Sequence, residues 1–165
     1  MDQTLRISEI FYSLQGETNT VGIPTVFVRL TGCPLRCSYC DTEYAFTGGE
    51  KFSQAEIISK IQAFNCQYVT ITGGEPLAQP GCNGLMVKLL DLGFCVSLET
   101  SGALDVSTVD PRVVKVMDLK TPSSGEMQRN RYANIQFLNP QDQVKFVIAD
   151  DVDYQWSKQQ LIEHQ

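Results

Sequence analysis

The sequence predicts an α/β protein in which parallel strands alternate with helices. Two observations support this: short, almost continuously apolar runs recur along the chain, and helical patterns separate them. Such runs are typical of parallel strands buried on both faces of a sheet. The pattern fits an open doubly wound sheet or part of a barrel, and in both architectures ligands bind at the C-terminal ends of the strands.

The first half of the chain predicts a strand, a helix and a second strand. Pro24–Leu30 (PTVFVRL) is rich in β-branched and aromatic residues, which favour a strand. Ser53–Phe64 predicts a helix, because Ser53 and Glu56 have the spacing of a capping box and isoleucines follow at helical spacing. Tyr68–Thr72 is the next apolar strand.

The second half repeats the alternation. Gly84–Leu92 predicts a helix that ends on Gly93, a residue favoured just after the last helical turn. Three further strands are expected at Phe94–Glu99, Val113–Met117 and Val144–Ala149.

A last helix opens at Asp151 and runs toward Gln165 without a glycine or asparagine stop signal. The 165 residues therefore predict a single domain over residues 1–165 that is cut short at its C-terminus.

Composition narrows the function classes. The net charge is -6 and the only basic cluster is the short Arg129–Arg131 segment, so binding to a nucleic-acid backbone is not expected. No apolar run is long enough to span a membrane, and we expect a cytoplasmic protein. In that compartment the six cysteines stay reduced, which leaves metal binding, catalysis or burial.

Three cysteines lie together directly after the first predicted strand. Cys33, Cys37 and Cys40 have the spacing C-x3-C-x2-C within GCPLRCSYCDT. Three thiolates in a tight loop can hold three corners of a 4Fe-4S cluster and leave one iron open, as a reactive centre requires. A zinc knuckle or plain buried thiols are the alternatives. The other three cysteines stand singly in helix or strand patterns and are expected in the core: Cys66, Cys82 and Cys95.

Polar residues follow three later strands. In TITGGEP, Gly73 and Gly74 would let the backbone approach a ligand, and Glu75 could accept hydrogen bonds from an ammonium group, although an ordinary strand-to-helix turn would look the same. Glu99–Gly102 and Asp118–Lys120 end the next two strands, so four loops are expected to face one edge of the sheet.

Arg29 lies inside a predicted strand and needs a partner. Its planar guanidinium suits a carboxylate, which could belong to a substrate or to Glu17 or Glu99 of the same chain.

These motifs resemble known sequences. The cysteine triplet and TGGEP resemble the radical SAM superfamily, in which S-adenosylmethionine (SAM) binds the fourth iron. With SLQGE, ETSG and DLKTPSSG, the chain from about residue 5 onward resembles the 7-carboxy-7-deazaguanine synthases of queuosine biosynthesis. The resemblance implies a partial TIM-like radical SAM barrel with parallel strands and outer helices. It also implies conversion of 6-carboxy-5,6,7,8-tetrahydropterin to 7-carboxy-7-deazaguanine with loss of ammonia.

The same resemblance implies partners and site residues. It implies Mg2+, a homodimer and an electron donor such as flavodoxin. The three cysteines would hold the 4Fe-4S cluster, and Thr42 would bind Mg2+ together with substrate oxygens and water. SAM contacts would come from Tyr39, Asp41, Gly74, Glu75, Asp118, Leu119 and Lys120. Pterin contacts would come from Leu14, Gln15, Gly16 and Thr72, with Arg29 on the pterin carboxylate.

Two other functions stay open on the sequence. A glycyl-radical-enzyme activase shares the cysteine triplet but lacks SLQGE and the Asp41-Thr42 ending. A non-catalytic zinc or iron-sulfur module would have a fully ligated metal and would not bind SAM.

Overall fold

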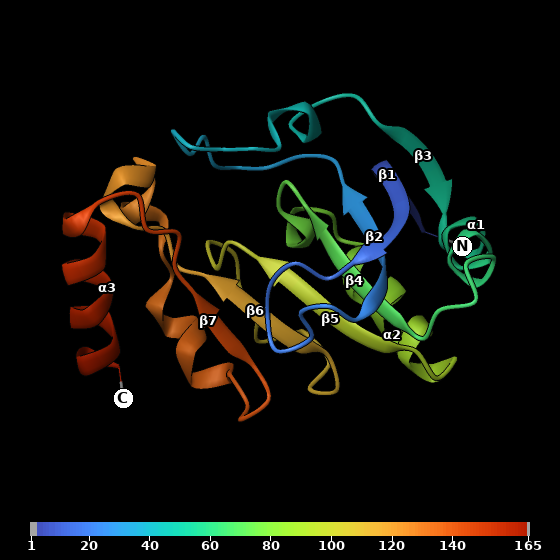
Figure 1. The fold of residues 1–165 in the computed structure, drawn as a ribbon. Helices are drawn as coiled ribbons and strands as arrows, with labels where there is room; N and C mark the ends of the chain where they lie inside the picture. Colours follow the sequence, from blue (N-terminus) through green and yellow to red (C-terminus); the bar gives the residue numbers. More distant parts are fainter. Residues whose placement is uncertain (1–2, 165) are drawn as a thin grey trace.

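The structure is a computed structural model that describes residues Gln3–His164. Its described part forms one seven-stranded sheet in the order β3-β1-β2-β4-β5-β6-β7 (Figure 1). The strands are β1 (Thr4–Leu14), β2 (Pro24–Leu30), β3 (Glu50–Ser53), β4 (Tyr68–Gly73), β5 (Cys95–Thr100), β6 (Val114–Asp118) and β7 (Gln143–Lys145). The α-helices are α1 (Gln54–Gln62), α2 (Cys82–Asp91) and α3 (Asp151–Glu163).

The sheet is mostly parallel and does not close. β2, β4, β5, β6 and β7 pair in parallel, in the order in which they follow one another in the chain. β3 and β7 form its two edges. The prediction of an incomplete α/β barrel is therefore confirmed.

Two strands depart from the predicted pattern. β1 was not predicted, and it pairs antiparallel with both β2 and β3. Its sequence alternates polar and apolar residues rather than forming an apolar run, which suits a strand near a sheet edge. The strand predicted at Val144–Ala149 ends instead at Lys145, after which the chain leaves the sheet.

The predicted helices are present. Ser53 and Glu56 form the capping box of α1, as their spacing predicted. α3 starts after the N-cap Asp150 and runs to Glu163. Gln165, toward which this helix was predicted to run, lies outside the described residues. None of the helices in the described part is both long enough and apolar enough to cross a membrane.

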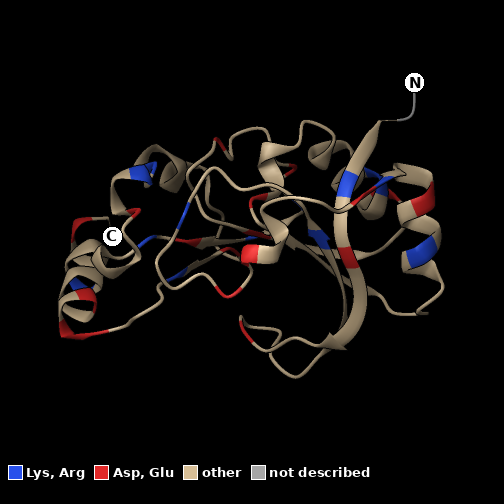
Figure 2. Cartoon of the chain, turned by 90° about the horizontal axis from the view of Figure 1, so that it is seen from above, with Lys and Arg blue, Asp and Glu red and all other residues tan. Residues whose placement is uncertain are grey.

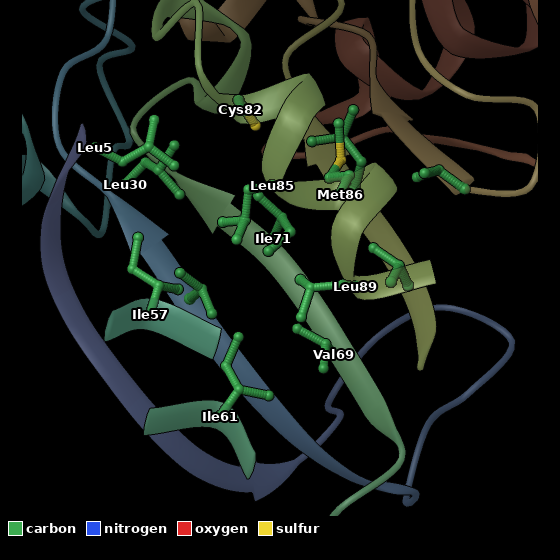
Figure 3. Packing of buried hydrophobic residues seen from close by; sticks show 14 of the residues in the cluster. Leu5, Leu30, Ile57, Ile61, Val69, Ile71, Cys82, Leu85, Met86 and Leu89 are labelled. Atoms are coloured by element: carbon green, nitrogen blue, oxygen red, sulfur yellow. The ribbon is translucent and has the colours of Figure 1, made fainter. Parts of the chain in front are cut away.

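One face of the sheet carries the core. The side chains of α1 and α2 pack on alternate residues of β2 and β4, among them Leu30, Val69 and Ile71 (Figure 3). Because successive side chains of a strand point to opposite faces, the residues between these apolar positions face the other side of the sheet. That other face is available to form a site.

The single cysteines do not all lie in the core. Cys82 is fully buried, as predicted. Cys66 is only partly buried, and its thiol donates to the Pro24 carbonyl oxygen at 3.1 Å. Cys95 is exposed at the start of β5, so the prediction of a core position was wrong for it.

Acidic and basic residues are interspersed over the described chain instead of gathering on one element (Figure 2). This distribution accompanies the net charge of -6.

Candidate active site

A cavity of about 460 Å3 lies over the non-core face of the sheet, at the C-terminal ends of the parallel strands. The strands contribute side chains that alternate with core residues: Phe27, Arg29, Thr72, Glu99, Val116 and Asp118. The loops that follow the strands supply most of the remaining wall. The cavity is therefore where the predicted parallel topology places a ligand site.

Residues Cys33–Cys40, here called the cysteine loop, follow β2 directly. All three of its cysteines are free thiols that line the cavity. Leu35 anchors the loop, since its side chain is 1% exposed. Burial raises the pKa of the Cys33 and Cys37 thiols, and the neighbouring thiols add to this, whereas Lys120 opposes it.

The donor set fits a cluster with three protein ligands. In the described residues, no three His, Cys, Asp or Glu side chains stand close enough to hold a metal ion as they are placed. The three thiols nevertheless share one cavity with a lysine ammonium beside them. His164, the only histidine, is absent from this wall and stacks on Tyr132 at 4.9 Å between ring centroids.

The Gly73-Gly74 turn packs against the cysteine loop. A Cβ on Gly74 would lie 2.4 Å from the Gly32 carbonyl oxygen and 2.9 Å from Cys33 Cβ, so only glycine fits. The Gly74 amide donates to the Leu30 carbonyl at 3.1 Å, which holds the turn in place. Gly74 also lines the cavity, as its predicted SAM contact requires.

The Glu75 carboxylate, predicted to accept hydrogen bonds from SAM, accepts them from other residues of the chain in this structure. It is fully buried and lies outside the cavity wall. Its carboxylate accepts hydrogen bonds from the Leu77 amide and from the hydroxyls of Thr100 and Ser101, and also from the Ser101 amide. These donors fill the acceptor sites of a carboxylate, so Glu75 fastens the loop after β4 to the end of β5, and its contact with SAM stays a prediction.

Arg29 faces the cavity but pairs with neither carboxylate named from the sequence. Its Nε donates to Glu9 Oε1 at 2.7 Å, and the Tyr44 hydroxyl donates to the same oxygen at 2.7 Å. Glu9 stands opposite Arg29 in the β1–β2 register. It could not be foreseen as the partner because β1 was not predicted.

Glu99 connects two predicted pterin contacts. Gln15 is buried and donates to Glu99 Oε1 at 3.2 Å, and the Thr72 hydroxyl donates to Glu99 Oε2 at 2.9 Å. Together these side chains form a polar strip along the cavity wall. The position of Glu99 at a strand end signalled such a role.

Lys120 and Lys145 bring positive charge to the cavity. Lys120 pairs with Asp118 at 3.0 Å; burial acts to lower its pKa, but Asp118 and Cys37 outweigh this and raise it. Lys145 pairs with Glu17 across the cavity rim, and it was missed because it lies inside a predicted apolar strand.

Most of the remaining predicted site residues line the cavity, namely Gly16, Tyr39, Asp41 and Thr42. Two do not. Leu14 is 61% exposed, because its side chain points away from the side on which Gln15 enters the cavity. Leu119 is buried on the other side of the chain from Asp118 and Lys120. Neither of these side chains lines the cavity, and the ligand contacts that the resemblance implies for Leu14 and Leu119 stay predictions.

Comparison with known proteins agrees with this site. Residues 27–119 match the model of the Radical SAM superfamily, and this stretch contains the cysteine loop and the Gly73-Gly74 turn. The open, mostly parallel sheet and the three-cysteine loop thus define a radical SAM enzyme.

Sequence relatives narrow the class. A 7-carboxy-7-deazaguanine synthase of Chlorobaculum tepidum is 47% identical over 97% of this chain and 74% of the relative. One from Koribacter versatilis is 44% identical over 97% of this chain and 72% of the relative. The chain belongs to the 7-carboxy-7-deazaguanine synthase family. These relatives do not favour the glycyl-radical activase or the non-catalytic metal module.

Solved structures show the same fold. The crystal structure of QueE from Escherichia coli superposes with a TM-score of 0.82 at 25% identity, covering 96% of this chain and 78% of that one. A structure of TYW1 with a lysine-pyruvate adduct bound has a TM-score of 0.63 at 12% identity, which is a likeness of fold.

Proposed function

We propose that this chain converts 6-carboxy-5,6,7,8-tetrahydropterin to 7-carboxy-7-deazaguanine with release of ammonia, as a radical SAM lyase of queuosine biosynthesis. The observation that carries the proposal is that one cavity brings the three cysteines together with Arg29 and the Gln15–Glu99–Thr72 strip. Cys33, Cys37 and Cys40 would hold a 4Fe-4S cluster, which with SAM supplies the radical chemistry.

The protein's own residues would bind and orient the substrate. The Arg29 guanidinium suits the pterin carboxylate, because it is already held toward the cavity by Glu9. The strip of Gln15, Thr72 and Glu99 offers donors and acceptors to the amide and amine groups of a pterin ring. Phe27, stacked on Phe11 at 5.0 Å, adds an apolar wall that excludes water.

The SAM side of the cavity would lie next to the cysteine loop. Tyr39, Asp41, Gly74, Asp118 and Lys120 all line this part of the wall. Glu75 and Leu119 would act through the backbone they support.

Thr42 is proposed as a magnesium ligand. It lies at the cavity with its hydroxyl donating to Asp41 Oδ1, and substrate oxygens and water would have to complete the site. On the family resemblance we also propose a cytoplasmic homodimer that receives electrons from a donor such as flavodoxin.

Electron paramagnetic resonance tests the proposal. The protein is reconstituted anaerobically with iron and sulfide, reduced, and measured with and without SAM. A 4Fe-4S signal that SAM shifts is expected, followed by turnover of the carboxypterin. Cys37→Ala should lose the signal, whereas Cys95→Ala, a change at an exposed cysteine outside the cavity, should keep it. A cluster that is indifferent to SAM would contradict the proposal.

A further inference from the structure

Arg36 lies inside the cysteine loop but takes no part in the cavity wall. Its Nη1 donates to the carbonyl oxygens of Cys33 at 2.8 Å and Leu35 at 2.6 Å. Its guanidinium carbon stands 4.2 Å from the centre of the Phe46 ring. A side chain that is free to extend into solvent is therefore folded back over its own loop.

These contacts tie the two ends of the segment together. Cys33 opens the cysteine loop, whereas Phe46 comes after Cys40 and the short helical turn η1 (Glu43–Ala45). The Arg36 amide also donates to Glu126 Oε1 at 2.5 Å, which links the loop to the segment that follows β6. Arg36 thus contacts Cys33 and Phe46 at the two ends of the thiol-bearing segment and links this segment to Glu126.

The loop needs such support before iron is bound. Three thiols that share one cavity must lose their protons to ligate iron, and the resulting thiolates repel one another at short range. Charge-assisted hydrogen bonds from a guanidinium to two carbonyl oxygens, combined with stacking on an aromatic ring, resist the opening of the loop. A lysine ammonium has the charge but lacks the planar guanidinium that stacks on the Phe46 ring.

We propose that Arg36 is a positioning residue that pre-organises the cysteine loop for the 4Fe-4S cluster. The inference rests on the proposed function, since it assumes that the loop holds a cluster. Arg36 would not touch SAM or the pterin. Its guanidinium would act through the backbone of Cys33 and Leu35, and its positive charge would favour the reduced cluster.

The test compares cluster retention in Arg36→Ala, Arg36→Lys and wild type. Arg112→Ala is the matched control, because Arg112 pairs with Asp91 and Asp110 away from the cavity. After anaerobic reconstitution, iron release to a chelator is followed by absorbance. We expect release from Arg36→Ala to be about tenfold faster than from wild type, with Arg36→Lys in between and Arg112→Ala unchanged.

Two further readouts separate positioning from a general loss of structure. The thermal midpoint of the iron-free protein should stay the same in Arg36→Ala, and the reduction potential should become more negative in Arg36→Ala but not in Arg36→Lys. If Arg36→Ala does not fold, the iron release of Arg36→Lys is the test. Iron release at the wild-type rate from a folded Arg36→Lys would overturn the inference.

Equal iron release from Arg36→Ala and wild type would also overturn it while leaving the proposed function intact. A wild-type protein that takes up no iron would overturn both.

Discussion

The Nε atom of Arg29 lies 2.7 Å from a carboxylate oxygen of Glu9, and the two residues face each other across the β1–β2 pair. The register of these strands shifts between Ile7 and Glu9, an irregularity of the kind that re-aims side chains. Arg29 is thereby held toward the cavity by a strand neighbour, before any substrate enters. A guanidinium held in this way has less conformational freedom to lose on binding.

Arg29→Ala should weaken binding of the carboxylated pterin by about tenfold or more, because a charge-assisted contact to the carboxylate is removed. Anaerobic titration calorimetry of the reconstituted protein measures the affinity. A tetrahydropterin without the carboxylate should bind both proteins alike, and the iron content should not change. Unchanged affinity for the carboxylated pterin would contradict the proposed role of Arg29 in binding the carboxylate.

The pKa of Glu9 should reflect its hydrogen bonds with Tyr44 and Arg29. Burial acts to raise the pKa of Glu9, but the hydrogen bonds from Tyr44 and Arg29 outweigh it, so the pKa lies below the ordinary 4.5. A folded-state pKa below the unfolded one means that this pairing stabilises the protein above pH 4.5 and is lost as the pH falls through the folded value.

Tyr44→Phe removes one of the two donors and should move the Glu9 pKa upward, as measured by carbon NMR of the carboxyl group. A Glu9 titration that is the same in both proteins would speak against the hydrogen bond.

Glu75→Gln should destabilise the protein by about 2–4 kcal/mol in urea unfolding, because an amide NH2 would face donors where the carboxylate now accepts. Glu43→Gln, at an exposed position, should change the free energy of unfolding by less than about 0.5 kcal/mol. If the two variants unfold alike, the buried hydrogen bonds of Glu75 do not hold β4 to β5.

The ion pair of Lys115 and Asp142 joins β6 to the segment before β7. Its N–O distance is 2.8 Å and its side chains are 2% and 0% exposed. Lys115→Met should cost roughly 3–5 kcal/mol, since it leaves a buried carboxylate without its cation. In the Lys115→Met background, Asp142→Asn should destabilise the protein less than it does in the wild type. Strictly additive changes in the free energy of unfolding would argue against coupling between the two residues.

The single cysteines should differ in reactivity. Burial raises the pKa of Cys82 to about 12, so its thiol stays protonated and inaccessible at pH 8. Cys95 is exposed and should be alkylated in the folded protein, as mass spectrometry can show. Modification of Cys82 at the same rate without denaturant would mean that α2 opens readily.

Much of the fold could be predicted from the sequence, because the core-facing residues of the parallel strands give short, mostly apolar runs. The apolar runs and the capping box at Ser53 located most of the sheet and α1. β1 was not predicted because its polar and apolar residues alternate. The last strand was predicted to extend beyond the observed end of β7 because Val147–Ala149 is apolar, although it pairs with no strand.

The sequence predicted which loops form the site, but not which of their side chains face the cavity. Spacing alone marked the cysteine loop, and strand ends marked Gly74, Asp118 and Lys120. Whether a side chain turns into the cavity depends on registers that sequence does not reveal. Glu75 shows this most clearly, because its carboxylate is hydrogen-bonded to Thr100 and Ser101, 25 and 26 positions away, and lies outside the cavity wall.

From β2 to β7, the order of strands in space is the order in which they are synthesised, apart from β3 on the far side of β1. Each new strand leaving the ribosome would therefore meet an edge that its predecessor has just completed, with no need to insert between strands already paired. The cavity would be assembled by the same succession, so the cysteine loop would be in place before the last wall arrives. A chain stalled just before β7 would then present a cavity that lacks only Lys145 and Val147 from its wall.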